Sequence, residues 1–380
     1  MSVENVRSKF VERFGHEPQI IAISPGRINL IGEHTDYNDG FVFPAAIDRG
    51  MYVAASVKEP ETLTLSVQTG EGVPFRVGRV APKFTTNWSK YPAGMGWAIT
   101  QESGIQLPNL EAVVDSTIPI GSGVSSSAAI ELAFGVTWSH LAKLALGNRE
   151  LAILGQRCEN QFVGVNCGIM DQMACALGKE GHAIFLDTRS LDVEYAHVPD
   201  GLTIVLCDTK KERALTTSAY NERRSQCEEA SKLMGVGKLR DADEHMLYVN
   251  KSKMTDVVYR RAKHVVSENA RCLKFKDALA QGNFGEIGLL MKASHQSLRL
   301  DYQVSCDELD AMAQAAWASP GCVGARMTGA GFGGACVALV KTNLVDAFTE
   351  SVLGLYKLAT GVQGEAMSCK VVDGARIVEA

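Results

Sequence analysis

A loop of glycines and serines joins a β-branched segment to a strongly apolar one, and it constrains the fold more than any other feature. The loop is Pro119-Ile120-Gly121-Ser122-Gly123-Val124-Ser125-Ser126-Ser127-Ala128. The segment LEAVVDSTIP before the loop predicts a strand, and AAIELAFGVTWSHLAKLAL after it predicts a buried helix. Glycines let the backbone approach a ligand closely, and a helix start attracts anions through its free N–H groups and its dipole. This order of elements favours a phosphate-binding loop.

A single capping serine at the helix start is the alternative explanation, and it requires no ligand. Two glycines and three consecutive serines exceed what a cap requires, and the hydroxyls could contact phosphate oxygens or Mg²⁺. The loop is not a Walker A motif, because G-x-x-x-x-G-K-[ST] occurs nowhere in the sequence. We therefore prefer phosphate binding of another kind.

Four further glycines lie in Gly329-Ala330-Gly331-Phe332-Gly333-Gly334, which has the form of the dinucleotide pattern G-x-G-x-x-G. That pattern requires a helix after the loop, whereas ACVALV follows here and predicts a buried strand. The sequence therefore argues against a dinucleotide site. Two explanations stay open: a hairpin turn, which needs only one or two glycines, and a loop pressed against a phosphate or a substrate.

Polar side chains crowd another loop near the N-terminus, from Arg27 to Asp39, with Glu33, His34 and Asp36 among them. A solvated surface loop is one explanation. The predicted strands on either side and the interleaved apolar residues indicate instead that some of these groups turn inward, where they could bind the hydroxyls of a polyol. A metal site is the weaker alternative, because this order of Glu, His and Asp is not a standard ligand spacing.

The rest of the chain predicts a mixture of strands and helices in which strands often follow strands. Apolar residues recur at helical spacing over 3–14, which predicts an amphipathic helix. QIIAIS predicts a strand that Pro25-Gly26-Arg27 should break, and SCKVVDG predicts the last strand. This order favours an α+β fold over a doubly wound parallel sheet. We expect an N-terminal domain over residues 1–195 and a C-terminal domain over 196–380.

Composition excludes several classes of function. The net charge is −5 with no basic block, so we expect no nucleic-acid partner and no attachment to membranes. No apolar run approaches the ~20 residues of a membrane span, and the first residues lack the apolar core of a signal peptide. The ten cysteines never form C-x-x-C, which indicates buried free thiols and a cytoplasmic location. Glycine is in excess, because 36 of the 380 residues are about 9.5% of the chain against an average of about 7%.

Together the three loops resemble those of the GHMP kinase superfamily, and the polar one resembles the galactokinase signature almost residue for residue. That segment is Pro25-Gly26-Arg27-Ile28-Asn29-Leu30-Ile31-Gly32-Glu33-His34-Thr35-Asp36-Tyr37-Asn38-Asp39-Gly40. The similarity extends over essentially the whole chain and includes ENQFVG, GIMDQ and YNERR at 159–164, 168–172 and 220–224. Val124 stands where the family usually has leucine, which is an apolar exchange of similar volume.

The resemblance implies ATP-dependent phosphorylation of the anomeric hydroxyl of α-D-galactose, which gives galactose 1-phosphate and ADP. This reaction would be the first step of galactose use by the Leloir pathway. The resemblance also implies an N-terminal domain like domain 2 of ribosomal protein S5 and a ferredoxin-like C-terminal domain, with the active site in the cleft between them. Galactose and ATP would be the partners, Mg²⁺ would accompany the ATP, and we expect a monomer.

Residue roles follow from the same resemblance. Asp171 would be the catalytic carboxylate, and Arg27 would lie beside it and beside the transferring phosphoryl group. The sugar-binding residues would be Glu33, His34, Thr35, Asp36, Gly168, Asp171 and Tyr220. The ATP-binding residues would be Gly121, Ser122, Gly123, Val124, Ser125, Ser126 and Ser127, with Trp88 and Tyr91 at the adenine. Ser127 and Glu159 would hold Mg²⁺.

Each of these residues has an ordinary structural explanation when it is taken alone. Asp171 could cap a helix or interact with its dipole, Glu159 could be a half-exposed helix charge, and His34 could be a structural histidine. Only their joint occurrence in one pattern favours catalysis. The sequence leaves open whether Asp171 removes the proton of the hydroxyl fully or mainly orients that hydroxyl.

Two other functions are alternatives to galactose phosphorylation. Some fungal relatives are ligand sensors that lack a Ser-Ala pair in the glycine-serine loop, whereas Ser125-Ser126-Ser127-Ala128-Ala129 is complete here. The other alternative is a kinase for N-acetylgalactosamine, arabinose or galacturonate. A carboxylate at C6 should be disfavoured beside Glu33, because like charges repel.

Overall fold

The computed structural model describes residues 3–119, 121, 123–212 and 216–380. Its strands are β1 (Ile20–Asn29), β2 (Phe41–Val42), β3 (Pro44–Val57), β4 (Leu63–Ser66), β5 (Gly70–Glu71), β6 (Leu110–Ser116), β7 (His182–Asp187), β8 (Val193–His197), β9 (Leu202–Lys211), β10 (Cys322–Thr328), β11 (Gly334–Lys341), β12 (Glu365–Cys369) and β13 (Arg376–Glu379). Its α-helices are α1 (Val3–Phe14), α2 (Lys90–Ser103), α3 (Ser126–Leu141), α4 (Asn148–Arg157), α5 (Met170–Leu177), α6 (Thr216–Met234), α7 (Glu244–Val249), α8 (Asp256–Ala280), α9 (Phe284–Ser297), α10 (Asp307–Ala318) and α11 (Val345–Thr360).

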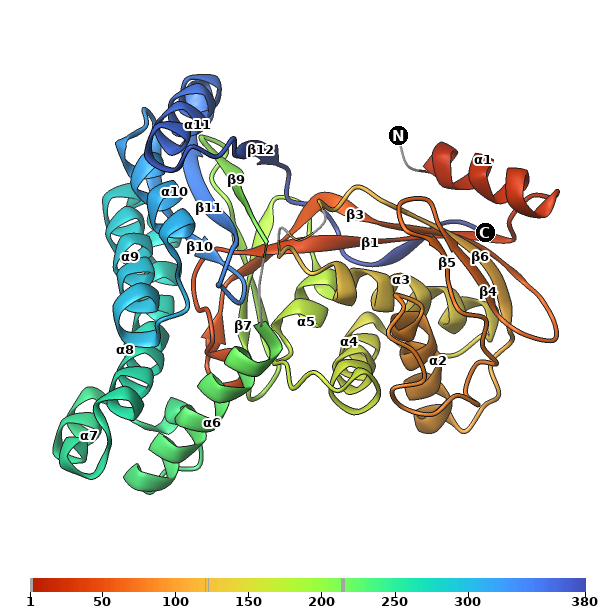
Figure 1. Ribbon diagram of the computed structural model, residues 1–380, viewed down its shortest axis with the longest axis horizontal. Helices are drawn as coiled ribbons and strands as arrows, with labels where there is room; N and C mark the ends of the chain where they lie inside the picture. Colours follow the sequence, from red (N-terminus) through yellow and green to blue (C-terminus); the bar gives the residue numbers. More distant parts are fainter. Residues whose placement is uncertain (1–2, 120, 122, 213–215) are drawn as a thin grey trace.

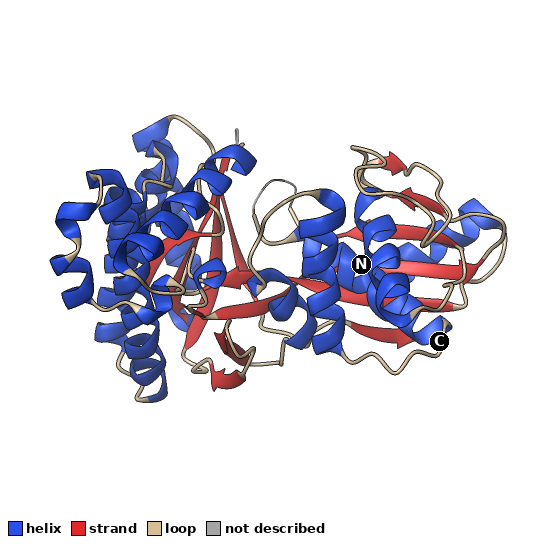
Figure 2. Cartoon of the chain, turned by 90° about the horizontal axis from the view of Figure 1, so that it is seen from below, coloured by secondary structure: helices blue, strands red, loops and turns tan. Residues whose placement is uncertain are grey.

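The strands form three sheets, and the predicted α+β class is confirmed. A six-stranded sheet has the order β13-β1-β3-β6-β4-β5, in which the β4–β6 pair is parallel and the other pairs are antiparallel. A four-stranded antiparallel sheet has the order β10-β11-β9-β12, and β2-β7-β8 form a small third sheet. In Figure 1, α2–α5 lie along one face of the six-stranded sheet, and α8–α11 gather beside the four-stranded sheet. Figure 2 shows the same two halves from below.

The first strand continues through the segment that was expected to break it. Proline has no N–H for a sheet ladder, but a β-bulge between Pro25 and Gly26 absorbs this defect, and pairing with β3 resumes at once. Beyond the bulge the N–H of Arg27 donates to the carbonyl of Val124, at 3.1 Å. A Cβ atom on Gly26 would lie only 2.6 Å from the same carbonyl oxygen, so the close approach requires glycine. The bulge therefore joins β1 to the glycine-serine loop.

The end of the chain returns to the N-terminal half. The strand predicted at SCKVVDG lies a few residues earlier, as β12. The sequence pattern did not indicate the last strand, β13, which pairs antiparallel with β1. Between them the N–H of Val372 donates to the carbonyl of Ala46 at 3.1 Å. The division at 195/196 stays a prediction, and the pairing of β13 places the final residues with the first half.

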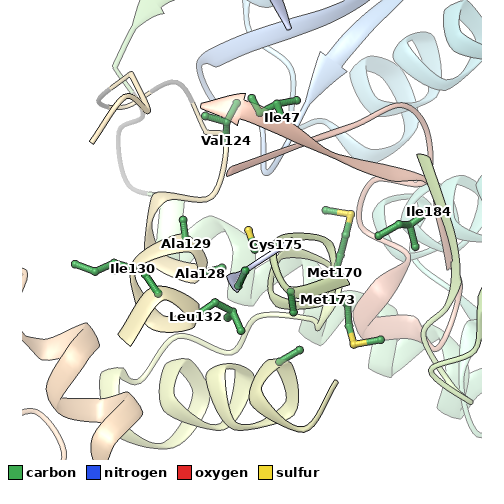
Figure 3. Close-up of a cluster of buried hydrophobic side chains, with 14 of the residues drawn as sticks. Ile47, Val124, Ala128, Ala129, Ile130, Leu132, Met170, Met173, Cys175 and Ile184 are labelled. Carbon is green, nitrogen blue, oxygen red and sulfur yellow. The ribbon is translucent and has the colours of Figure 1, made fainter. Parts of the chain in front are cut away.

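Apolar burial explains why these helices pack where they do. The predicted N-terminal helix is confirmed as α1, with Val6 and Phe10 fully buried. The strongly apolar α3 is buried on nearly all sides, and Figure 3 shows Ala128 and Leu132 of α3 beside Cys175 and Met173 of α5. All ten cysteines are free thiols. None of the helices in the described ranges is long and apolar enough to cross a membrane.

Candidate active site

An arginine and an aspartate from distant segments meet where β1, α5 and the glycine-serine loop converge. Arg27, which is buried, places Nε at 2.8 Å and Nη2 at 2.7 Å from Oδ1 of Asp171. Its third nitrogen, Nη1, donates to the carbonyl of Gly123 at 2.7 Å. Ser125 Oγ donates to the other carboxylate oxygen, Oδ2, at 2.5 Å. The carboxylate of Asp171 is therefore fixed from both sides.

Asp171 is not the cap of its helix. The residue before the first turn of α5 is Ile169, and Asp171 lies within that turn, where the helix dipole favours a negative charge. Its side chain is one-third exposed, although Arg27 beside it is buried. A carboxylate held in this way and facing open space is available to a reacting group.

The residues around Asp171 enclose a cavity of about 360 Å³. Most of the predicted sugar, metal and catalytic residues line this cavity together, namely Arg27, Glu33, His34, Asp36, Ser127, Glu159, Gly168, Asp171 and Tyr220. Gly329 and Ala330 of the third loop line it as well, which favours the open alternative of a loop pressed against a ligand. Tyr91, Val165, Cys167, Met170 and Gln172 complete the wall. Met170 and Gln172 lie in the GIMDQ segment, but the sequence assigned no role to them, to Val165 or to Cys167.

Glu33 is held on one oxygen by groups of the third loop and its preceding strand. Its Oε1 accepts the N–H of Gly329 at 2.7 Å, the hydroxyl of Thr328 at 3.3 Å and Nη1 of Arg326 at 3.4 Å. Burial raises the pKa of Glu33, and the charges of Arg326 and Arg27 oppose that rise. Arg326 is fully buried, and no local sequence pattern indicated its place, because it is 293 residues from Glu33.

His34 is a neutral, fully bonded imidazole at the cavity wall. Nδ1 lies 2.8 Å from the hydroxyl of Tyr37, and Nε2 lies 3.2 Å from the carbonyl oxygen of Ala330. Burial lowers the pKa of His34 to about 3.

Thr35 has a different place from the one expected, since its buried hydroxyl lies 2.8 Å and 2.6 Å from the carbonyls of Gly32 and Phe41. Thr35 therefore holds the loop together, and the cavity residues described above do not include it.

Asp36 and Gly168 are in close contact. A Cβ atom at Gly168 would collide with the carboxylate of Asp36, so any other residue here would displace that carboxylate. Oδ2 of Asp36 accepts the N–H of Met170 at 3.4 Å. Burial and the neighbouring charge of Asp171 raise the pKa of Asp36 to about 7. The carboxylates of Asp36 and Asp171 thus interact within one cavity, with Arg27 as a nearby cation.

A second cavity of about 200 Å³ adjoins the first, and Tyr91 and Ser127 line both. Trp88, Gly121 and Ser126 from the predicted nucleotide site also line it, with residues of β3, β4 and β6 that the sequence did not indicate. Ser122 lies outside the described residues.

Three other residues of the glycine-serine loop contact the Arg27–Asp171 pair. Gly123 and Val124 offer their carbonyls to Arg27, and Ser125 donates to Asp171. The loop thus borders the second cavity with one part and fixes the Arg27–Asp171 pair with another.

Ser127 and Glu159 lie together between the two cavities. Glu159, in the π-helical turn Cys158–Val163, is nearly buried, and its carboxylate forms a hydrogen bond with Ser127. Burial raises the pKa of Glu159 to about 7, while Ser127 and Lys90 lower it. One hydroxyl and one carboxylate are hard oxygen ligands of the kind that Mg²⁺ uses beside phosphate groups. Within the described ranges no cluster of three or more His, Cys, Asp or Glu side chains could hold a metal by itself.

Comparison with known proteins identifies the family. Residues 8–57 match the galactokinase galactose-binding signature, residues 90–179 the N-terminal domain of GHMP kinases, and residues 275–354 their C-terminal domain. The galactokinase of Chloroflexus aurantiacus is 42% identical over 377 residues, covering 98% of this chain and 96% of that protein. The galactokinase of Glaesserella parasuis is 36% identical over 381 residues, covering 99% of each.

Solved structures agree with this result. The crystal structure of Lactococcus lactis galactokinase complexed with galactose superposes with a TM-score of 0.93 and 37% sequence identity, covering 98% of this chain and 99% of that one. Methanococcus jannaschii mevalonate kinase shares the fold, with a TM-score of 0.65 at 18% identity over 93% of this chain and 99% of that one. From its signature and its full-length similarity to galactokinases, the chain belongs to the galactokinase family of the GHMP kinases and is a sugar kinase.

Proposed function

We propose that this chain transfers the γ-phosphoryl group of ATP to the anomeric hydroxyl of α-D-galactose, with Asp171 and Arg27 at the reacting centre. The observation that carries this proposal is the placement of the Arg27–Asp171 pair in one cavity that adjoins a second. The larger cavity would hold the sugar and the transferring phosphoryl group, and the smaller one the adenine. Asp171 would then lie between the sugar hydroxyl and the nucleotide phosphates.

The residues at the centre suit phosphoryl transfer, which depends on positioning and on neutralising the phosphoryl oxygens. The anomeric oxygen forms a bond to the γ-phosphorus as the bond from the γ-phosphorus to the β,γ-bridging oxygen breaks, and ADP leaves. The proton of the anomeric hydroxyl goes to Asp171, which orients that hydroxyl before transfer. Arg27 stays charged and presents a rigid set of donors that can stabilise charge on the phosphoryl oxygens.

Mg²⁺ fits the donor set at the junction of the two cavities. Ser127 and Glu159 would hold it, with the ATP phosphates and water as its other ligands. The ion supplies positive charge that offsets the phosphates when it is bound. It would also favour the carboxylate form of Glu159, whose pKa burial raises to about 7.

The sugar-binding residues would divide the hydroxyls of galactose among them. Glu33 and His34 lie beside the third loop and would bind the 6-hydroxyl side, and Asp36 would accept the 3- and 4-hydroxyls. Tyr220, whose ring lies 5.5 Å from that of His34, would contact a ring hydroxyl. The structure of the L. lactis relative complexed with galactose supports this choice of sugar.

We further propose that the chain acts as a monomer in a reducing cytoplasm. All ten cysteines are free thiols, which supports the reducing compartment.

A panel of sugars tests the function. The purified chain would be incubated with Mg-ATP and galactose, N-acetylgalactosamine, arabinose or galacturonate, and ADP release would be followed. We expect galactose to give the highest kcat/KM. Folded protein that binds galactose and ATP without turnover would identify a ligand sensor instead, and a higher kcat/KM for another sugar would change the substrate.

A further inference from the structure

A row of buried hydrogen-bonding groups runs from His34 into the C-terminal half of the chain. The hydroxyl of Tyr37 lies 2.8 Å from Nδ1 of His34, and the hydroxyl of Tyr302 lies 2.6 Å from that of Tyr37. Sγ of Cys227 lies 3.2 Å from the Tyr302 hydroxyl. Cys227 and Tyr302 are fully buried, and Tyr37 is nearly so. Buried groups of this kind are almost always hydrogen-bonded, so the hydrogens must be ordered along the row.

The row has one direction that satisfies every group. The carbonyl oxygen of Ala330 can only accept, so the hydrogen of the neutral His34 lies on Nε2 and Nδ1 is an acceptor. The hydroxyl of Tyr37 therefore donates to Nδ1. Its oxygen then accepts from Tyr302, and the oxygen of Tyr302 accepts from the thiol of Cys227.

The conformation of His34 is also held from its backbone and from its ring faces. Its φ of +64° lies in the left-handed region, which is costly for a residue other than glycine and is often kept at functional sites. Nδ2 of Asn38 donates to the His34 carbonyl at 3.0 Å. The His34 ring lies 4.8 Å from the ring of Tyr302 and 5.5 Å from that of Tyr220.

We propose that Tyr37, kept in place by Tyr302, is a positioning residue for sugar recognition that holds His34 as the Nε2–H tautomer at the cavity wall. This inference rests on the proposed function, because it assigns the hydrogen-bonding character of the sugar site. With Nε2–H, His34 presents at the cavity wall a donor that the Ala330 carbonyl accepts, and a sugar hydroxyl that takes over this donor can also donate to Glu33. With the other tautomer, bare Nε2, the Ala330 carbonyl and Glu33 would present only acceptors.

The first test is the tautomer itself. Two-bond ¹H–¹⁵N NMR spectra of the protein labelled with ¹⁵N-histidine distinguish the protonated ring nitrogen from the bare one, and the His34→Gln variant identifies the His34 signals. We expect wild-type His34 to carry its hydrogen on Nε2. A hydrogen on Nδ1, or two equally populated tautomers, would overturn the proposal. This readout requires no turnover, so it is independent of whether the chain phosphorylates galactose.

The second test uses Tyr37→Phe with Tyr356→Phe as its matched control. Tyr356 is another fully buried tyrosine, and its hydroxyl donates to the carbonyl of Thr209 at 2.8 Å. Loss of one hydrogen bond predicts that Tyr37→Phe raises KM for galactose about three- to tenfold, with kcat within about twofold. We expect KM for ATP to stay unchanged, and Tyr356→Phe to leave KM for galactose unchanged.

Two comparisons separate this role from a merely structural one. We expect Tyr37→Phe to have no further effect on KM for galactose in a His34→Gln background, since the hydroxyl acts through His34. We also expect Tyr37→Phe to leave KM for 6-deoxygalactose unchanged, because that sugar lacks the 6-hydroxyl that His34 would bind. Additive effects of the two substitutions, or equal losses with both sugars, would contradict the proposal. Absence of turnover in the wild type would contradict the proposed function alone.

Discussion

Arg27 and Asp171 meet on a single carboxylate oxygen, with two guanidinium nitrogens at 2.8 and 2.7 Å from Oδ1. Oδ2, on the other side of the carboxylate, is left to Ser125 and to the open cavity. Because Arg27 is buried and Asp171 is partly exposed, the pair has a rigid side and an accessible side. This asymmetry fits a carboxylate that must keep its orientation while it exchanges one hydrogen-bond partner for a substrate.

Asp171→Asn should remove nearly all activity while nucleotide binding persists. An amide cannot accept the proton of the anomeric hydroxyl, and loss of a general base typically lowers the rate about 10²- to 10⁴-fold. ADP release measures kcat, and calorimetry measures ATP affinity. Asp200→Asn is a matched control, since that side chain is 99% exposed, and it should behave as the wild type. Substantial activity in Asp171→Asn would refute the role of Asp171.

Ser125→Ala and Ser126→Ala should affect different kinetic constants although the two serines are adjacent. Ser125 donates to Asp171, and a hydrogen bond to a charged group is worth about 1.5–3 kcal/mol, so kcat should fall at least about tenfold. Ser126 lines the smaller cavity, and its loss should mainly raise KM for ATP. Steady-state kinetics with each substrate varied would show whether kcat or KM for ATP changes in each variant. Identical changes in both variants would mean that Ser125 does not act through Asp171.

The sequence identified the loops of the site because their residue types are unusual in themselves. Repeated glycines indicated places where backbone approaches closely, as Gly331 of the third loop does to the carbonyl of Val304. The sequence did not identify contacts that depend on the tertiary fold. Arg326 comes from β10, 293 residues from Glu33, and no local pattern connects the two. The continuation of β1 through Pro25 was missed for a related reason, because the compensating contact is the Val124 carbonyl on a distant loop.

Galactose affinity should depend on pH through Asp36. Burial and the charge of Asp171 raise the pKa of Asp36 to about 7, so the carboxyl becomes protonated below that pH and loses acceptor capacity for sugar hydroxyls. The dissociation constant for galactose should therefore rise as pH falls below about 7, by up to about tenfold per pH unit. Calorimetry without nucleotide measures it, and the dependence should vanish in Asp36→Asn. A flat profile in the wild type would contradict the assignment.

Asp36 should also make the stability of the folded protein depend on pH, but in the opposite direction to galactose affinity. The pKa of Asp36 in the folded protein is about 7, above its ordinary value of 3.8, so protonation favours the folded state. The stabilisation is fully present below about pH 4 and is lost as pH rises through about 7. Thermal unfolding without ligands should therefore show Asp36→Asn to be more stable than the wild type at pH 8 and similar to it at pH 4. This is the sign expected of a residue kept for binding at some cost in stability.

Arg326→Met should destabilise the protein, and Glu33→Gln should offset much of that loss. Arg326 is fully buried with Nη1 3.4 Å from Oε1 of Glu33, so removing this cation leaves a buried carboxylate whose charge only Arg27 still offsets. Breaking a buried pair in this way typically costs about 3–5 kcal/mol. Urea unfolding should show this loss in Arg326→Met and recovery of at least half of it in the double variant. Arg299→Met, at a half-exposed residue, should change stability by less than about 1 kcal/mol.

Galacturonate should be a poor substrate. Its C6 carboxylate would lie beside Glu33, which is 2% exposed, and two like charges about 4 Å apart repel by about 4 kcal/mol near a protein surface. Arg326 and Arg27 offset part of this repulsion, so we expect kcat/KM about a hundredfold below that for galactose. Glu33→Gln should narrow this difference, because it lowers kcat/KM for galactose and removes the charge that repels galacturonate. Efficient turnover of galacturonate by the wild type would show that Glu33 does not face C6 of the sugar.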